Sequence, residues 1–378
     1  MPKQTSSTPR TTPKVDGPSG GTPTGTATYG KRFQSRFAAD YFREASNGLC
    51  VSSIGVGTYL GNNADDDDRA YTAVVRRAIE SGINLIDTAI NYRSQRSEQA
   101  IGEAIQDVLS AGVVSRDELV ICSKGGYIPL DRTPPATREE YQRYVRREFI
   151  DSEILRADEI SGGGHSLAPR FLRYCLAKSR QNLGLRSIDI YYLHNPGQQL
   201  ATLAPDEVRP RLKAAFAFLE EAASRGEIGA YGCATWDELR VPPDTRGHLA
   251  LEELVAIARG LAGEAHHFRF LQLPINLAML EAVRAPTQML AGKPVSVVEA
   301  AAELELSVVS SASLMQGRLA SGLSEAVRAH FPELETDAQR ALAFVRTIPG
   351  VTTALVGMKQ LAHLDENLDA ARAPSGTE

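Results

Sequence analysis

The chain has 378 residues, of which 43% are hydrophobic and 23% are charged, and its formal net charge is −5. This composition is typical of a soluble globular protein with a large core, in one large domain or two. The charges are mixed and form no basic stripe, so we expect no nucleic-acid partner. No run of about 18 apolar residues predicts a membrane-spanning helix.

The N-terminal segment, residues 1–30, is rich in Thr, Pro, Ser and Gly and has almost no large apolar side chain before Tyr29. Such a segment cannot bury enough apolar surface to offset its ordering entropy, so we predict a disordered tail. It also lacks the apolar stretch of a secretory signal. With a short C-terminal tail over 373–378, this leaves 31–372 as one predicted domain.

Four cysteines, Cys50, Cys122, Cys175 and Cys233, lie far apart in the sequence. Cys122 and Cys233 fall inside apolar strand-like runs, where buried reduced thiols are expected. This cysteine usage fits a reducing, cytoplasmic location best.

Short apolar runs alternate with longer segments of helical period from about residue 54 onward. Alternation of this kind indicates repeated βα units around a parallel sheet. The predicted strands are residues 54–57, 83–87, 118–123, 188–193, 228–233, 268–273, 306–310 and 352–356. The predicted helices are residues 68–81, 97–109, 169–183, 206–224, 248–261, 295–304, 337–347 and 360–371. Eight units favour a (βα)8 TIM barrel in the α/β class over an open doubly wound sheet, whose glycine-rich phosphate signature is missing.

A long connection, residues 126–165, interrupts this regularity after the third predicted strand. It is far longer than the usual loop of about 4–6 residues, is densely charged and is predicted to contain a helix near 138–150. Loops that follow barrel strands gather at one face, so the insertion should lie near the barrel mouth. We interpret it as a lid or substrate-selecting element, with an inert surface or an oligomer contact as the alternative.

Four titratable residues follow three of the predicted strands: Asp87 and Tyr92 the second, Lys124 the third and His194 the fourth. Strand ends of a parallel barrel converge on one mouth, so these side chains should meet. A phenol, with a pKa of about 10, becomes a useful proton donor when a neighbouring cation stabilises its phenolate. Lys124 can supply that cation, Asp87 can hold it, and His194 can orient a carbonyl. Singly, each residue could be a turn, packing or surface residue; together they indicate a proton-donating site.

Several short blocks occur in a defined order: Gly57-Thr58-Tyr59, Asp87-Thr88-Ala89-x-x-Tyr92, Ser97-Glu98-x-x-Ile101-Gly102, Lys124 and Leu193-His194. Their spacing and order resemble the aldo-keto reductase superfamily over roughly residues 48–370, with the tail and the insertion outside the resemblance. The resemblance implies the same eight-stranded barrel and assigns Tyr92 as the general acid. Lys124 and Asp87 would then lower its pKa, and His194 would orient the substrate.

The resemblance also implies a nicotinamide cofactor that lies extended across the barrel mouth without a Rossmann domain. The positions that would bind it are Gly57, Thr58, Thr235, Gln272, Ser311, Leu314, Gln316, Gly317, Gly357, Lys359, His363, Glu366 and Asn367. Four positions depart from the family pattern: Thr235 replaces Asn, Ala234 replaces Ser, Ser311 replaces a stacking aromatic residue, and His363 stands where many members have Arg. Lys359 can supply the cation for a 2′-phosphate, or it can be a solvated turn lysine, so NADPH is favoured over NADH.

These features predict an NAD(P)H-dependent oxidoreductase that reduces a small aldehyde or ketone to an alcohol, or runs the reverse reaction. The predicted substrate-contacting residues are Tyr59, Asn195 and Trp236, with ordinary packing as the alternative for Trp236. A nicotinamide-binding regulatory subunit and a non-redox proton-transfer or dehydration enzyme remain as alternative functions. No metal ion is predicted.

Overall fold

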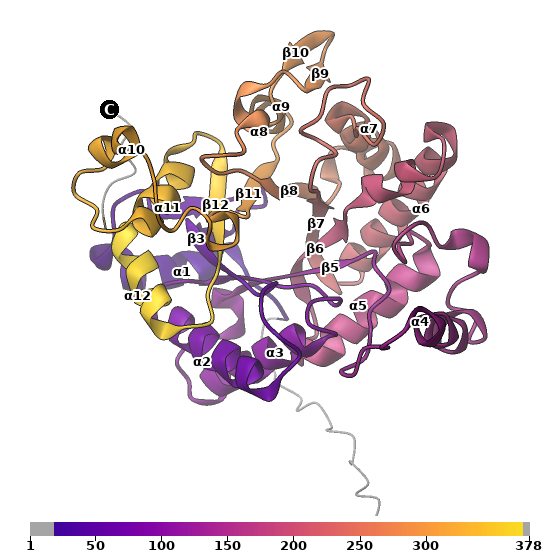
Figure 1. The fold of residues 1–378 in the computed structure, drawn as a ribbon, viewed down its shortest axis with the longest axis horizontal. Helices are drawn as coiled ribbons and strands as arrows, with labels where there is room; N and C mark the ends of the chain where they lie inside the picture. The colour runs from indigo at the N-terminus through magenta and orange to yellow at the C-terminus, as the bar shows by residue number, and fades with distance from the viewer. Residues whose placement is uncertain (1–18, 373–378) are drawn as a thin grey trace, which may run out of the picture.

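Eight parallel strands close into a barrel at the centre of residues 19–372, the part of the chain that the computed structural model describes (Figure 1). The barrel strands are β3 (Ile54–Gly57), β4 (Leu85–Asp87), β5 (Val120–Gly125), β6 (Ile188–His194), β7 (Ile228–Ala234), β8 (Phe268–Pro274), β11 (Ser307–Ser311) and β12 (Val351–Gly357). They pair in the order β11-β12-β3-β4-β5-β6-β7-β8 and close by pairing β8 with β11. All eight predicted strands are present, and the predicted barrel is confirmed over the open sheet.

A ring of helices surrounds the barrel (Figure 1). The helices of the βα units are α2 (Asp65–Ser81), α3 (Arg96–Ser110), α5 (Pro169–Leu183), α6 (Pro205–Ser224), α7 (Leu251–Ala262), α9 (Val297–Glu303), α11 (Asp337–Thr347) and α12 (Leu361–Ala370). In α2, four aspartates occupy the first turn, where the helix dipole favours negative charge. That helix ends at Gly82, whose φ of 112° suits glycine and whose added Cβ would lie 2.6 Å from the Phe37 ring. Local sequence therefore sets both ends of this helix.

Two apolar layers form the core, one between strands and helices and one inside the barrel. Side chains alternate between them along each strand, so that Ile121 faces the helices and Cys122 faces the interior. A hairpin of β1 (Phe42–Glu44) and β2 (Cys50–Ser52), which the sequence analysis did not predict, contributes Leu49 and Val51 to the interior layer. One end of the barrel is thereby filled with apolar side chains.

The segment before this hairpin forms helix α1 (Pro23–Phe33). Thr22 caps the helix by accepting a hydrogen bond from the Gly25 amide at 3.0 Å. Tyr29 is fully buried and its hydroxyl donates to the Ile79 carbonyl of α2 at 2.5 Å. The predicted disordered tail is therefore wrong for residues 23–30, because tertiary burial of one aromatic side chain overrides a polar local composition. Residues 1–18 and 373–378 lie outside the described residues.

The insertion carries helix α4 (Arg138–Val145), which continues into a π-helical turn over Arg146–Ile150. This agrees with the helix predicted near 138–150. Phe149 packs edge-on against Phe171 and Tyr174 of α5, with ring centroids 5.9 and 5.4 Å apart. Figure 1 shows α4 beyond α5 at the periphery. The body of the insertion thus covers α5 from outside, and only its ends approach the barrel mouth.

Other short elements include α8 (Glu281–Arg284), the hairpin of β9 (Gln288–Leu290) and β10 (Lys293–Val295), and α10 (Glu325–His330). None of the helices within residues 19–372 is long and apolar enough to cross a membrane. The four cysteines are all free, and Cys122, Cys175 and Cys233 are buried.

Two arginines join the beginning of the barrel to its end. Arg346 is fully buried and donates to the Ser53 hydroxyl at 3.0 Å and to the Ala370 carbonyl at 2.8 Å. Arg43 donates to the Val351 carbonyl at 2.6 Å. These contacts fix the segment around β3 against the last βα unit.

Candidate active site

A cavity of about 730 Å³ opens at the C-terminal ends of the barrel strands. Every residue predicted to contact cofactor or substrate lines it, together with three of the four titratable residues. These lining residues are Gly57, Thr58, Tyr59, Asp87, Tyr92, His194, Asn195, Thr235, Trp236, Gln272, Ser311, Leu314, Gln316, Gly317, Gly357, Lys359, His363, Glu366 and Asn367. The fourth, Lys124, is fully buried behind Asp87. The structure therefore brings the whole predicted set to one place.

Asp87 and Lys124 form a buried ion pair at the floor of the cavity. Strands β4 and β5 hold them side by side, with Lys124 Nζ 2.5 Å from Asp87 Oδ2 and 2.8 Å from the Thr88 carbonyl. Gln272 donates to the other oxygen of Asp87 at 2.8 Å. Burial by itself would lower the pKa of Lys124, but the nearby Asp87 and Tyr92 outweigh it and raise that pKa. Lys124 is therefore a cation at neutral pH.

Tyr92 lies in the loop after β4, with the Lys124 ammonium 4.8 Å from its ring centroid. Burial raises the pKa of Tyr92, and the positive charge of Lys124 acts against that rise. The phenol therefore carries its proton at neutral pH. The resemblance implied that Lys124 and Asp87 both lower the pKa of Tyr92. Lys124 acts in that direction, whereas the charge of Asp87 acts to raise the pKa, and burial decides the net rise.

The turn that follows Tyr92 is left-handed over three successive residues, Arg93, Ser94 and Gln95, with φ between 49° and 70°. Non-glycine residues reach this conformation only when tertiary contacts fix them. Arg93 supplies such contacts by donating to Asp68 of α2 at 2.6 Å and to the Asn62 carbonyl at 2.9 Å. The loop that carries the phenol is thus tied to α2.

His194 ends β6 and faces Tyr92, with ring centroids 5.7 Å apart and planes at 76°. Burial, Lys124 and His165 together hold the pKa of His194 well below its ordinary value. Its imidazole is therefore neutral at physiological pH. The buried Nδ1 has no hydrogen-bond partner among the described residues. Tyr127, at the start of the insertion, stands edge-on to the same ring at 5.1 Å.

The cavity wall offers polar atoms without protein partners. Thr235 Oγ1 and Asn367 Oδ1 are buried, line the cavity and make no hydrogen bond within the described residues. Buried polar atoms are normally paired, so each calls for a ligand group or a water molecule. Gln272 uses its amide donor on Asp87, which leaves its carbonyl oxygen as an acceptor. These polar atoms fit the carboxamide of a nicotinamide and the exocyclic amine of an adenine.

Lys359 stands at the far end of the cavity, where it is already paired. Its Nζ lies 2.8 Å from Asp67 Oδ1 of α2, and the Lys359 side chain is 36% exposed. Lys359 is thus partly solvated and is also paired with a carboxylate from another element. Lys359 hydrogen-bonding holds the pKa of Asp67 below its ordinary value.

Sequence reasoning missed several lining residues, including Leu60, Tyr71, Asn91, Tyr127 and Gln360. Asn91 and Tyr127 lie just beyond strand ends, so a search for polar side chains past each strand would have found them. Tyr71 comes from the middle of a helix, and nothing in its local sequence marks it.

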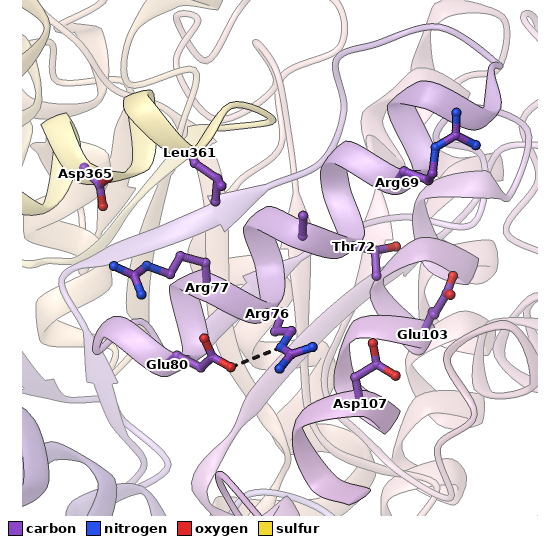
Figure 2. Close-up of a pocket in the computed structure, with 10 residues that line it drawn as sticks. Arg69, Thr72, Arg76, Arg77, Glu80, Glu103, Asp107, Leu361 and Asp365 are labelled. Atoms are coloured by element: carbon purple, nitrogen blue, oxygen red, sulfur yellow. Dashed lines mark hydrogen bonds and ion pairs between the residues drawn. The ribbon is translucent and has the colours of Figure 1, made fainter. Parts of the chain in front are cut away.

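A second depression, of about 580 Å³, lies on the outer surface between α2, α3 and α12 (Figure 2). Exposed charges of both signs surround it, and Arg76 pairs with Glu80 at 3.1 Å. None of the predicted site residues is there. Within residues 19–372, no group of three or more His, Cys, Asp or Glu side chains is arranged to hold a metal ion.

A model of the aldo/keto reductase family matches residues 53–241 of the chain. The chain belongs to this family. The match covers the first five barrel strands, β3 to β7, and so includes the Asp87–Lys124 pair, Tyr92 and His194.

Relatives with curated descriptions match about half of this chain. A D-threo-aldose 1-dehydrogenase from a Pseudomonas species is 30% identical over 191 residues, which are 50% of this chain and 51% of that protein. An NADH-specific methylglyoxal reductase from Escherichia coli is 27% identical over 194 residues, 50% of each chain. The chain thus spans about half the length of the curated relatives it matches.

Solved structures extend the likeness of fold to most of the chain. An aldo/keto reductase from Klebsiella pneumoniae, in complex with NADP and acetate, is 19% identical and has a TM-score of 0.57, over 88% of this chain and 90% of that one. The holo form of an aldo-keto reductase from Bacillus halodurans is 18% identical with the same TM-score, over 89% and 92%. At these identities the likeness supports the barrel and nothing finer.

Proposed function

We propose that the protein is an NAD(P)H-dependent oxidoreductase that reduces a small aldehyde or ketone to an alcohol, or catalyses the reverse oxidation. The observation that carries this proposal is the meeting of Tyr92, the Asp87–Lys124 pair and a neutral His194 at one end of a long cavity. The nicotinamide, when bound, supplies or accepts the hydride. The side chains of this chain move the proton.

In this mechanism Tyr92 donates its hydroxyl proton to the carbonyl oxygen as negative charge develops there. Lys124 stabilises the phenolate that remains, and Asp87 keeps the ammonium in place at 2.5 Å. The neutral His194 donates an N–H hydrogen bond to the same oxygen, which orients the carbonyl toward Tyr92. In the reverse direction the Tyr92 phenolate accepts the proton of the alcohol.

The cofactor is proposed to lie along the cavity, held by residues with free hydrogen-bonding capacity. Thr235 and the carbonyl oxygen of Gln272 would hold the nicotinamide amide, and Asn367 with Glu366 would hold the adenine. The remaining predicted positions, Gly57, Thr58, Ser311, Leu314, Gln316, Gly317, Gly357 and His363, line the wall between these ends.

The substrate is proposed to enter beside Tyr59 and Trp236, which stand at the rim with 59% and 46% of their surfaces exposed. Tyr59 contacts Tyr92 edge-on at 5.2 Å, and Asn195 lies next to His194. Tyr127 completes this aromatic wall. A small carbonyl compound with apolar substituents suits such a lining.

Replacement of Tyr92 by Phe tests the proposal. We expect kcat to fall by about 10²–10⁴-fold because the proton donor is lost, while the Kd for the reduced cofactor stays near the wild-type value. Steady-state assays over a panel of carbonyl compounds measure kcat, and fluorescence titration of the cofactor measures its Kd. Wild-type turnover by Tyr92→Phe, or cofactor binding by wild type with no turnover on any compound, would contradict the proposed reaction.

We propose NADPH as the preferred cofactor, with Lys359 as the cation for its 2′-phosphate. Among the described residues that line the cavity, which also include His363, Lys359 is the lysine. Replacement by Ala should weaken NADPH binding roughly tenfold and leave NADH binding unchanged. Equal losses for the two cofactors, measured by fluorescence titration, would reject this role. One curated relative is NADH-specific, so the measurement decides between the two.

A further inference from the structure

The last residue of the insertion, His165, is fully buried directly beneath His194. Its Nε2 lies 2.8 Å from the backbone carbonyl oxygen of His194. Its Nδ1 lies 2.9 Å from the side-chain amide nitrogen of Gln199, which is also fully buried. The insertion therefore reaches the reacting end of the cavity through this imidazole as well as through Tyr127.

The protonation of His165 follows from its partners. Arg211 donates to Gln199 Oε1 at 3.0 Å, and a guanidinium can only donate, so the Gln199 amide nitrogen must face His165. That nitrogen donates to Nδ1, which must therefore be unprotonated. The proton of the neutral ring then sits on Nε2 and is donated to the His194 carbonyl. Burial lowers the pKa of His165 to about 4, which keeps the ring neutral.

The peptide unit after His194 is consequently held at both ends. Its carbonyl accepts from His165, and its N–H, which belongs to Asn195, donates to the Ala234 carbonyl at 2.6 Å. Asn195 itself is left-handed, with φ of 47°, a conformation that asparagine tolerates better than most residues. Gly126 makes room for the contact, because an added Cβ would lie 2.9 Å from both His165 Nε2 and the His194 carbonyl.

The Nδ1 atom of the His194 ring makes no hydrogen bond within the described residues, so no such bond fixes the ring itself. Its orientation depends on its backbone and on edge contacts with Tyr92 and Tyr127. Tyr127 also stands edge-on to His165 at 4.9 Å, and its hydroxyl accepts from Asn195 at 3.0 Å. His165 thus holds the backbone of His194 by a hydrogen bond, and Tyr127 packs against its ring.

We propose that His165 is a positioning residue: through its Nε2–H bond to the His194 carbonyl, it sets the orientation of the His194 imidazole toward the substrate. The proposal rests on the proposed function of His194 and gives the insertion a role as a support for the reacting end. A substrate carbonyl tolerates little misplacement, so loss of one such bond should be visible in kcat.

Three variants test this role. His165→Leu removes the donor, His165→Gln places an amide N–H near the position of Nε2, and Tyr144→Phe removes a hydrogen bond to the Pro129 carbonyl elsewhere in the insertion. We expect His165→Leu to lower kcat about tenfold with little change in the Kd for NADPH. His165→Gln and Tyr144→Phe should remain close to wild type. Wild-type kcat in His165→Leu, or an equal loss in His165→Gln, would overturn the proposal.

Nitrogen-15 NMR of the histidine rings gives a measurement that does not depend on turnover. His165 should show the neutral Nε2–H tautomer at pH 7, and the ring shifts of His194 should change in His165→Leu but not in Tyr144→Phe. An Nδ1–H tautomer in wild type, or unchanged His194 shifts in His165→Leu, would overturn the proposal. Changed shifts in a protein without carbonyl reductase activity would support the positioning and reject only the proposed function.

Discussion

The two ends of the cavity are held in different ways. At the reacting end, strands β4, β5 and β6 supply Asp87, Lys124 and His194, and Lys124 is fully buried. At the outer end, Lys359 and His363 come from the segment after β12 and are partly or largely exposed. Buried charges are strongly coupled to folding, whereas exposed pairs contribute little to it. Changes at the reacting end should therefore affect stability and chemistry together, and changes at the outer end should affect affinity alone.

The largest expected effect is on Lys124. Lys124→Met leaves Asp87 as an unpaired buried carboxylate, so we expect the free energy of unfolding to fall by about 3–5 kcal/mol. The double variant Asp87→Asn, Lys124→Met removes both charges and should recover part of that loss. Urea unfolding followed by circular dichroism measures both variants. Equal stability of the single and double variants would contradict the claim that the buried charges at the reacting end are coupled to folding.

Acid sensitivity should also come from the reacting end. The pKa of His165 is lowered from its ordinary 6.5 to about 4, so between these values the unfolded chain binds a proton that the folded chain does not. The free energy of unfolding should therefore fall as pH falls through this window, by at most about 1.4 kcal/mol per pH unit from this residue. His165→Gln should lose that dependence, and Tyr144→Phe should keep it. The free energies of unfolding of wild type and His165→Gln would be measured with urea at pH 7, 6 and 5. The same dependence on pH in both proteins would show that His165 is not its source.

The smallest effect is expected at the outer end. Asp67 neutralises Lys359 at 2.8 Å, so Asp67→Asn should free the ammonium and strengthen NADPH binding severalfold, on the order of 0.5–1 kcal/mol. NADH binding should not change, and the free energy of unfolding should change by less than about 1 kcal/mol. Asp66→Asn, which removes the same charge from an exposed neighbour paired with Arg69, is the matched control. If both variants strengthen NADPH binding alike, the general charge of α2 is responsible and the specific pair is not.

Most of the correct predictions came from the order and spacing of the strand-like segments in the sequence. The period of each segment identified all eight βα units, and polar residues at strand ends identified the side chains that meet at the mouth. Each of these features is read from a short stretch of sequence. A parallel barrel then places the C-terminal ends of all its strands at one face.

The long-range contacts that pair or position the residues around the cavity could not be predicted in the same way. Asp67 reaches Lys359 across 292 positions, and His165 reaches the carbonyl of His194 from an insertion outside the family blocks. Helix α1 was missed for a related reason: Tyr29 gains its burial from α2, which no window around residue 29 contains. Long-range packing decides such positions, and local propensity does not.

Closure of the barrel has a consequence for synthesis of the protein. The first barrel strand, β3, pairs with the last, β12, and Arg43 and Arg346 join the same two regions. A nascent chain therefore cannot complete this sheet until residues 351–357 have left the ribosome. Until then β3 keeps an unpaired edge, and such edges invite association with other chains. Contacts between such distant residues also favour slow folding. We therefore expect chaperones to raise the expression yield even if the finished barrel is stable.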